Sequence, residues 1–161
     1  MIDPGSDDFM RQAIQLAYTG MKGGHGGPFG AVIVRDGIVV GQGHNRVLSS
    51  NDPTAHAEVT AIRDASARLQ KFDLSGTEIY VNGMPCPMCM AAIFWARIGR
   101  VYYACAPADA EAIGFDDAAF YREFDKPPEE RSVPAMQMVR HVEAGRACFK
   151  TWAELETRIP Y

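Results

Sequence analysis

Three residues in two short segments have the types and spacing of metal ligands. Cys86 and Cys89 stand three positions apart at the start of a predicted helix, so both sulfur atoms can face the same side. His56 lies in the first turn of a second predicted helix and can supply a third ligand. Three protein ligands leave the fourth position of a tetrahedral zinc ion open for water. The pattern therefore predicts a catalytic zinc site.

Glu58 is the carboxylate that local spacing places nearest to this site. Two thiolates cancel the charge of a zinc ion, so water bound there is activated less strongly than at an all-histidine site. A nearby base should therefore help by accepting a proton. Glu58 follows His56 by two positions, and we expect it to be that base.

A Cys-x-x-Cys pair can also be a redox pair or half of a structural zinc site. A redox pair would need neither His56 nor Glu58, and a four-cysteine structural zinc site would need a second cysteine pair. Cys105 and Cys148 are far apart in the sequence and form no such pair. We expect each of these two to be a buried apolar residue.

Predicted strands alternate with predicted helices along the chain, which indicates an α/β fold. Asp36-Gly37 is a strong signal for a hairpin turn, and Thr54 is a candidate helix cap. The segment 114–134 is expected to be a covering loop. The expected strands are Phe29–Arg35, Ile38–Gln42, Ile79–Val81, Val101–Ala104 and Met136–Val142, and the expected helices are Phe9–Met21, Ala55–Leu69, Pro87–Ala96, Ala108–Ile113 and Ala147–Arg158.

Length and composition suit one ordinary domain. The chain has 161 residues, 47% of them hydrophobic and 22% charged, with a net charge of −4. An acidic balance argues against a general affinity for nucleic acid, which calls for a basic face. It leaves room for one small uncharged base as substrate.

A cytoplasmic location without a membrane span is expected. Met1–Ser6 lacks the basic start and apolar core of a secretory signal. The uncharged run Ile79–Ala96 contains Asn82, two prolines and two cysteines, so we interpret it as a strand, a turn and a helix. A Cys-x-x-Cys pair in such a chain serves metal or redox chemistry more often than a structural disulfide.

With these residues in view, the chain resembles the cytidine and deoxycytidylate deaminase superfamily. The order of His56, Glu58 and the segment Pro85–Cys89 matches the zinc-deaminase signature H-x-E followed by P-C-x-x-C. Within the superfamily the chain is similar to the bacterial members that deaminate guanine. That likeness is carried by Gly26–Val34, Ser50–Arg63, Trp95–Arg97, Gly114–Asp117, Asp125–Arg131 and Tyr161.

The resemblance implies a three-layer αβα sandwich with a mixed five-stranded sheet. It implies a homodimer whose C-terminal segment crosses to the partner, a bound Zn²⁺ and hydrolysis of guanine to xanthine and ammonia. The implied site residues are Asn45 and the backbone of Ala57 as holders of the base, Phe29 and Trp95 as its walls, Asp117 as a second proton shuttle, and Tyr161 as the group that closes the partner's pocket.

One departure from the family pattern leaves the substrate open. Gly83 and Met84 stand where the family has a cysteine or another small residue followed by a glutamate. A guanine nucleoside, an aminotriazine, cytosine or a modified purine could then be the substrate. Adenosine in tRNA and a non-catalytic zinc-stabilised module are further alternatives. Glu58 argues against the last of these, because a structural site has no use for a free carboxylate.

Overall fold

Alternate side chains of the central strand divide the core into two halves. In β1 (Gly30–Arg35), Ala31 and Ile33 join one cluster of buried side chains, and Val32 and Val34 join another. Alternation of this kind follows from the two-residue period of a strand when both of its faces are covered. The sheet is therefore the middle layer of a sandwich.

The computed structural model describes residues 5–161, and in them the sheet has four strands. Its order is β2 (Ile38–His44), β1, β3 (Glu78–Gly83) and β4 (Arg100–Cys105). β1 pairs antiparallel with both β2 and β3, while β3 and β4 are parallel. The mixed sheet is as expected, with four strands in place of five.

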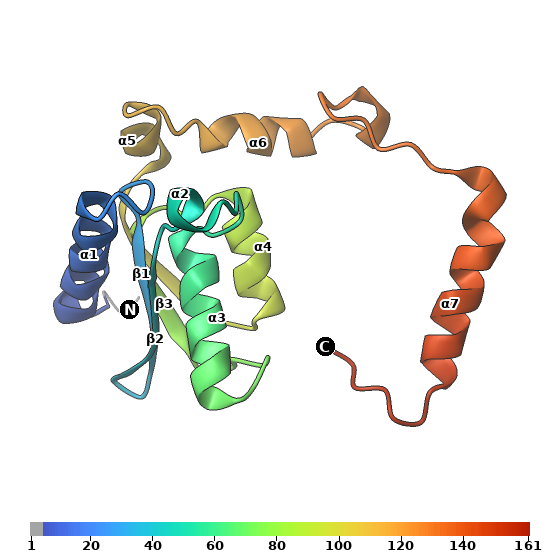
Figure 1. Ribbon diagram of the computed structural model, residues 1–161, viewed down its shortest axis with the longest axis horizontal. Coiled ribbons are helices and arrows are strands. Elements are labelled where there is room, and N and C mark those ends of the chain that lie inside the picture. The colour runs from blue at the N-terminus through green and yellow to red at the C-terminus, as the bar shows by residue number, and fades with distance from the viewer. Residues whose placement is uncertain (1–4) are drawn as a thin grey trace. The chain divides into compact units, whose positions relative to one another are not determined.

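Helices cover both faces of this sheet (Figure 1). α1 (Asp7–Lys22) packs on β1 and β3 through Ala13, beside the second cluster. α3 (Ala57–Leu69) and α4 (Pro87–Trp95) pack on the opposite face, where Ala61 and Ile93 join the first cluster. The three-layer α/β architecture predicted from the sequence is confirmed.

Two glycines of β2 bring α3 unusually close to the sheet. A Cβ atom at Gly41 would lie 2.5 Å from the Cβ of Ala65 and 2.7 Å from the carbonyl oxygen of Ala61. A Cβ atom at Gly43 would lie 2.6 Å from the carbonyl oxygen of Ala57. Small residues on both surfaces permit this approach, which fixes the start of α3 against the end of β2.

The chain divides into two compact units, of which the first ends at Ala118 and the second is Ala119–Tyr161. The remaining elements of the first unit are α2 (Val47–Ser50) and α5 (Pro107–Glu111). α6 (Asp117–Phe124) crosses the division, and the second unit contains η1 (Pro128–Glu130), η2 (Val139–His141) and α7 (Val142–Glu154). In both units, no described helix is long and apolar enough to cross a membrane.

Several predictions for the C-terminal part were wrong. The segment 114–134, expected to be a covering loop, contains the helix α6 instead. The expected strand Met136–Val142 ends in η2 and the start of α7, and its residues Met136, Met138 and Val139 are exposed rather than paired in a sheet. Cys105 and Cys148 are also exposed, not buried.

Thr54 is not the cap of α3. The helix begins at Ala57 and its N-cap is His56, while the Thr54 hydroxyl donates to Asp52 Oδ1 at 2.7 Å. Of Met1–Ser6, where no secretory signal is expected, residues 1–4 lie outside the described residues.

Candidate metal centre and active site

The starts of α3 and α4 bring the three expected ligands together. His56 is the N-cap of α3 and Cys86 the N-cap of α4, where Pro87 begins the helix without needing a backbone N–H. Cys89 follows in the first turn of α4. One ligand atom from each of the three residues lies within 4.8 Å of the others. The grouping predicted from the sequence is therefore present in the fold.

The spacing of these atoms fits a tetrahedral ion. His56 Nδ1 lies 3.6 Å from Cys86 Sγ and 3.6 Å from Cys89 Sγ. Zinc–nitrogen and zinc–sulfur bonds of roughly 2.0 and 2.3 Å at tetrahedral angles place nitrogen about 3.5 Å from each sulfur. The two observed nitrogen–sulfur separations match that value, so the three side chains are placed to hold one zinc ion.

The charges of the two cysteines also favour a cation. A hydrogen bond from Cys89, with His56 assisting, lowers the pKa of Cys86 to about 4. The same hydrogen bond, together with burial, raises the pKa of Cys89. The Cys86 thiolate therefore accepts a hydrogen bond from the Cys89 thiol, and a bound metal ion would take the place of the thiol proton. The amides at the start of α4 stabilise thiolates further.

Glu58 is buried beside the three ligands, with only 6% of its surface exposed. Burial raises its pKa to about 7. A carboxyl group with such a pKa can both accept and donate a proton near neutral pH, which is what general acid–base catalysis requires.

These groups open onto a cavity of about 290 Å³. That size lies near the lower end for small-molecule sites. His56, Glu58 and Cys86 form part of its wall, which also contains several of the expected substrate-binding residues. Its other lining residues are Gly26, Gly27, Phe29, Asn45, Val47, Leu48, Pro53, Met84, Phe115 and Asp117. A larger cavity of about 620 Å³, lined by Arg46, Arg63 and Asp64 among others, includes none of the metal-ligand group.

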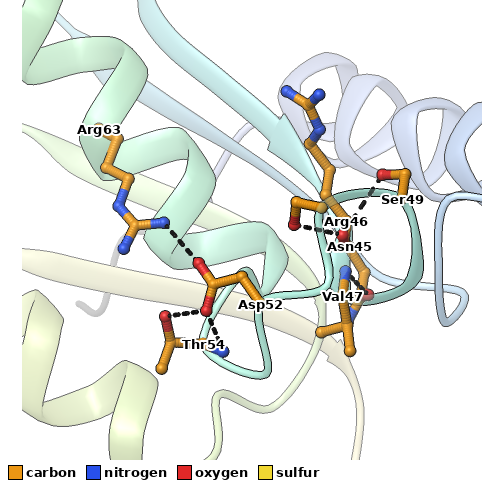
Figure 2. Close-up of polar contacts among 8 residues, drawn as sticks. Asn45, Arg46, Val47, Ser49, Asp52, Thr54 and Arg63 are labelled. Atoms are coloured by element: carbon orange, nitrogen blue, oxygen red, sulfur yellow. Dashed lines mark hydrogen bonds and ion pairs between the residues drawn. The ribbon is translucent and has the colours of Figure 1, made fainter.

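Asn45 is held firmly in the wall of the smaller cavity. Its side chain is 4% exposed, and its Oδ1 accepts a hydrogen bond from the backbone N–H of Val47 at 3.1 Å (Figure 2). The backbone N–H of Asn45 donates to the carbonyl of Phe29 at 2.9 Å. The oxygen of the side-chain amide is thus used within the fold, which leaves the amide NH₂ for a ligand.

The turn before His56 is tied to α3 by Asp52. Its Oδ1 accepts from the backbone N–H and the hydroxyl of Thr54, at 2.8 and 2.7 Å. Its other oxygen lies 3.5 Å from the guanidinium of Arg63 on α3 (Figure 2). This bracing fixes the backbone from which His56 projects.

Phe29 is positioned from two sides. The Asn82 side chain brackets it, accepting from the N–H of Gly30 at 2.8 Å and donating to the carbonyl of Pro28 at 2.9 Å. A Cβ atom at Gly83 would lie 3.3 Å from the Phe29 ring. Asn82 and Gly83 therefore shape the wall that Phe29 forms.

Phe115 and Met84 line the cavity but were not singled out as site residues from the sequence. Phe115 meets Phe29 edge-on, with ring centroids 5.0 Å apart. A Cβ atom at Gly27 would lie 2.9 Å from Phe115, so the glycine makes room for that ring. Phe115 belongs to the Gly-Phe-Asp-Asp stretch, and that motif was the available signal.

The remaining expected residues have varied positions. Asp117 reaches the cavity, where burial and the nearby Cys86 charge raise its pKa. Ala57 is fully buried at the first position of α3. Trp95 is 65% exposed and does not line this cavity, while Tyr161, in the second unit, is 71% exposed.

Comparison with known families places this centre in a defined class. Residues 5–105 match the family model described as the cytidine and deoxycytidylate deaminase zinc-binding region. The chain belongs to this family, and the three-ligand group lies within the matched residues.

Individual relatives differ in how much of this chain they match. The guanine deaminase of Bacillus subtilis strain 168 is 45% identical over 157 residues, which cover 96% of this chain and 98% of the relative. A solved structure of Bacillus subtilis guanine deaminase superposes with a TM-score of 0.93 at 44% identity, covering 98% of this chain and 99% of that one. A tRNA-specific adenosine deaminase of Buchnera aphidicola is 38% identical, but the match covers 63% of this chain and 66% of the relative.

Proposed function

We propose that this protein is a zinc-dependent hydrolase that converts guanine to xanthine and ammonia. The observation that carries the proposal is the group His56, Cys86 and Cys89 in the wall of a cavity that also contains Glu58. Similarity to a guanine deaminase over nearly the whole chain supports guanine as the substrate.

His56, Cys86 and Cys89 would hold the zinc ion. Their donor set of one imidazole and two thiolates suits zinc, and three protein ligands suit a catalytic rather than a structural site. When bound there, zinc supplies the Lewis acidity that makes a water molecule nucleophilic near neutral pH.

Glu58 would move the protons of the reaction. Water adds to the ring carbon that carries the exocyclic amine, forming a C–O bond, and the C–N bond then breaks. The Glu58 carboxylate accepts a proton from water and delivers it to the ring nitrogen whose double bond to that carbon opens. It then accepts the proton of the added hydroxyl and delivers it to the departing amine, so a C=O bond forms as ammonia leaves as a neutral molecule. Asp117, on the same cavity, would act as a second shuttle, and its raised pKa is suited to holding a proton.

Four further residues would bind the base, and two of them line the cavity. Phe29 would stack on the ring, and the Asn45 amide NH₂ would donate to a ring acceptor. The backbone N–H of Ala57, in the first turn of α3, would donate a second hydrogen bond. Trp95 would wall in the base, although it lies outside the lining of this cavity.

A homodimer forms part of the same proposal. Tyr161 would close the pocket of the partner, which would give a function to an exposed aromatic residue at the end of the chain.

We also propose that both compact units belong to one deaminase domain, because the match to the Bacillus subtilis relative covers both. The four cysteines are free, which suits a reducing cytoplasm.

An ammonia-release assay on the zinc-loaded protein tests the proposal. The panel would contain guanine, guanosine, cytosine, adenine, an aminotriazine and a tRNA with adenosine in its anticodon. Guanine should give the highest kcat/KM, and xanthine should appear in a ratio of one to ammonia. Faster release from another member of the panel would contradict guanine as the substrate, and no release from any member would contradict the enzyme assignment.

A further inference from the structure

Two histidines outside the metal centre are joined directly to each other. His25 Nδ1 and His44 Nε2 are 2.8 Å apart, and the two ring centroids lie 5.0 Å apart with 22° between the ring planes. At this distance one imidazole donates a hydrogen bond and the other accepts it. Burial, with His25 and Arg46 nearby, lowers the pKa of His44 and so favours its neutral form.

His25 ties the loop after α1 to α2. Its carbonyl oxygen accepts hydrogen bonds from the backbone N–H groups of Leu48 and Ser49, both at 3.0 Å. Its own N–H donates to the carbonyl of Gly20 in α1, also at 3.0 Å. The backbone of His25 is therefore bonded both to the helix that precedes it and to the segment that follows Asn45.

His44 is fixed at the end of β2 by its contact with α1. A Cβ atom at Gly20 would lie 2.4 Å from the His44 ring, so α1 packs directly on the imidazole. Both histidines are partly buried. The His44 ring is thus held between the end of β2 and α1, where it meets His25.

The chain neighbours of the two histidines make a contact of their own. Gly26 follows His25, and Asn45 follows His44. A Cβ atom at Gly26 would lie only 2.1 Å from Asn45 Oδ1, so the Asn45 side chain rests on the backbone of Gly26. Both residues line the cavity of the metal centre. The imidazole pair thus joins the loop that contains Gly26 to the end of β2, and these two segments hold Asn45 in the cavity wall.

We propose that His25 and His44 form a clamp that positions Asn45 and the Gly26 backbone for binding the base, an inference that rests on the proposed function. They are positioning residues, because neither lines the cavity. Loss of the hydrogen bond lets the loop and the end of β2 separate, and the binding-competent arrangement is then populated for less of the time. The apparent affinity for substrate falls by the same factor, while the proton transfer at Glu58 is unaffected.

Kinetics of matched variants test the clamp. His25→Ala and His44→Ala should each raise KM for guanine about three- to tenfold, the range for loss of one partly buried hydrogen bond, with kcat changed less than twofold. An asparagine amide has the reach of Nδ1 and a glutamine amide that of Nε2, so His25→Asn and His44→Gln should restore KM to within twofold. His141→Ala, an exposed histidine in the second unit, is the control and should match wild type.

A double variant separates a clamp from two independent packing residues. In His25→Ala/His44→Ala, KM should rise no further than in the worse single variant, because the two side chains form one interaction. Unchanged KM in the single variants would overturn the clamp. So would a double variant whose KM equals the product of the two single effects, or Asn and Gln variants as impaired as the Ala variants.

Hydrogen exchange decides the clamp independently of the substrate. The amides of residues 45–49 should exchange faster in His25→Ala and His44→Ala than in wild type, and at the wild-type rate in His25→Asn and His44→Gln. Wild-type protein that exchanges as expected but releases no ammonia from guanine would refute the proposed function and leave the clamp standing. Equal exchange in wild type and both Ala variants would overturn the clamp whatever the substrate.

Discussion

A single added methyl group at Gly26 should impair substrate binding far more than folding. The Cβ of an alanine there would lie 2.1 Å from Asn45 Oδ1 and 3.2 Å from the Asn45 carbonyl oxygen. The φ angle of Gly26 is not in the positive region, so the backbone itself tolerates alanine. Relief must therefore come from the Asn45 side chain, which has to move by more than 1 Å to reach ordinary van der Waals contact.

That movement has a calculable effect. A displacement of about 1 Å at a group that orients substrate can cost a factor of about 100, and one lost polar contact costs about 1–3 kcal/mol. We expect kcat/KM for guanine to fall about 10- to 100-fold in Gly26→Ala. Folding loses only the hydrogen bond from the Val47 N–H, about 1 kcal/mol, so Tm should fall by only about 2–4 °C.

The assay combines steady-state kinetics, zinc content by atomic emission and Tm by calorimetry. Gly145→Ala is the matched control, because a Cβ atom there meets nothing within 4 Å. It should keep full activity. Gly26→Ala combined with Asn45→Ala should be no worse than Asn45→Ala alone, since both changes remove the same contact. A Gly26→Ala protein that retains zinc and keeps kcat/KM within threefold of wild type would contradict this prediction.

Four further predictions follow from the site and the fold. Glu58→Gln should keep its zinc and lose about 10²- to 10⁴-fold in turnover; more than a tenth of wild-type kcat would exclude Glu58 as the proton shuttle. Cys86→Ala should lose its zinc in elemental analysis and unfold at a lower temperature, because binding of the metal adds to the free energy of folding; full zinc occupancy would contradict the ligand assignment. Gly41→Ala should destabilise the protein by about 1–3 kcal/mol in urea titrations through the overlap with α3, whereas Gly99→Ala, with a nearest contact of 3.5 Å, should change little. The pKa of His44 in the folded protein lies below its ordinary value of 6.5, so unfolding takes up a proton at His44. The free energy of unfolding should therefore decline as the pH falls below about 6.5, and His44→Gln should remove that part of the decline. Identical pH profiles of stability for wild type and His44→Gln would contradict this role of His44.

The metal centre could be predicted from the sequence because its ligands occupy helix starts. The position of Pro87 after Cys86 and the spacing of Cys86 and Cys89 both locate a first turn, and a first turn dictates where side chains point. The hairpin turn at Asp36-Gly37 could also be predicted from the sequence, and Asp36 adopts a positive φ of 51° there. Local geometry decides these features, so a local pattern reveals them.

Other features depend on contacts that no local pattern contains. The His25–His44 pair joins the loop after α1 to the end of β2, and neither histidine has a distinctive sequence context. Phe115 enters the cavity because Gly27 leaves room for its ring, which only packing reveals. Met136–Val142 is rich in apolar residues, as a strand can be, but Met136, Met138 and Val139 are exposed and the segment pairs with no strand among residues 5–161.

The metal ligands all come from one stretch of chain, between β2 and β4, and this sets an order of assembly during synthesis. His56 emerges from the ribosome before Cys86 and Cys89, and the three-ligand group is complete once the first turn of α4 has emerged. Asp117 and the whole second unit follow later. A nascent chain that does not yet contain Asp117 therefore already contains all three candidate ligands, so metal binding does not have to wait for the last part of the cavity wall.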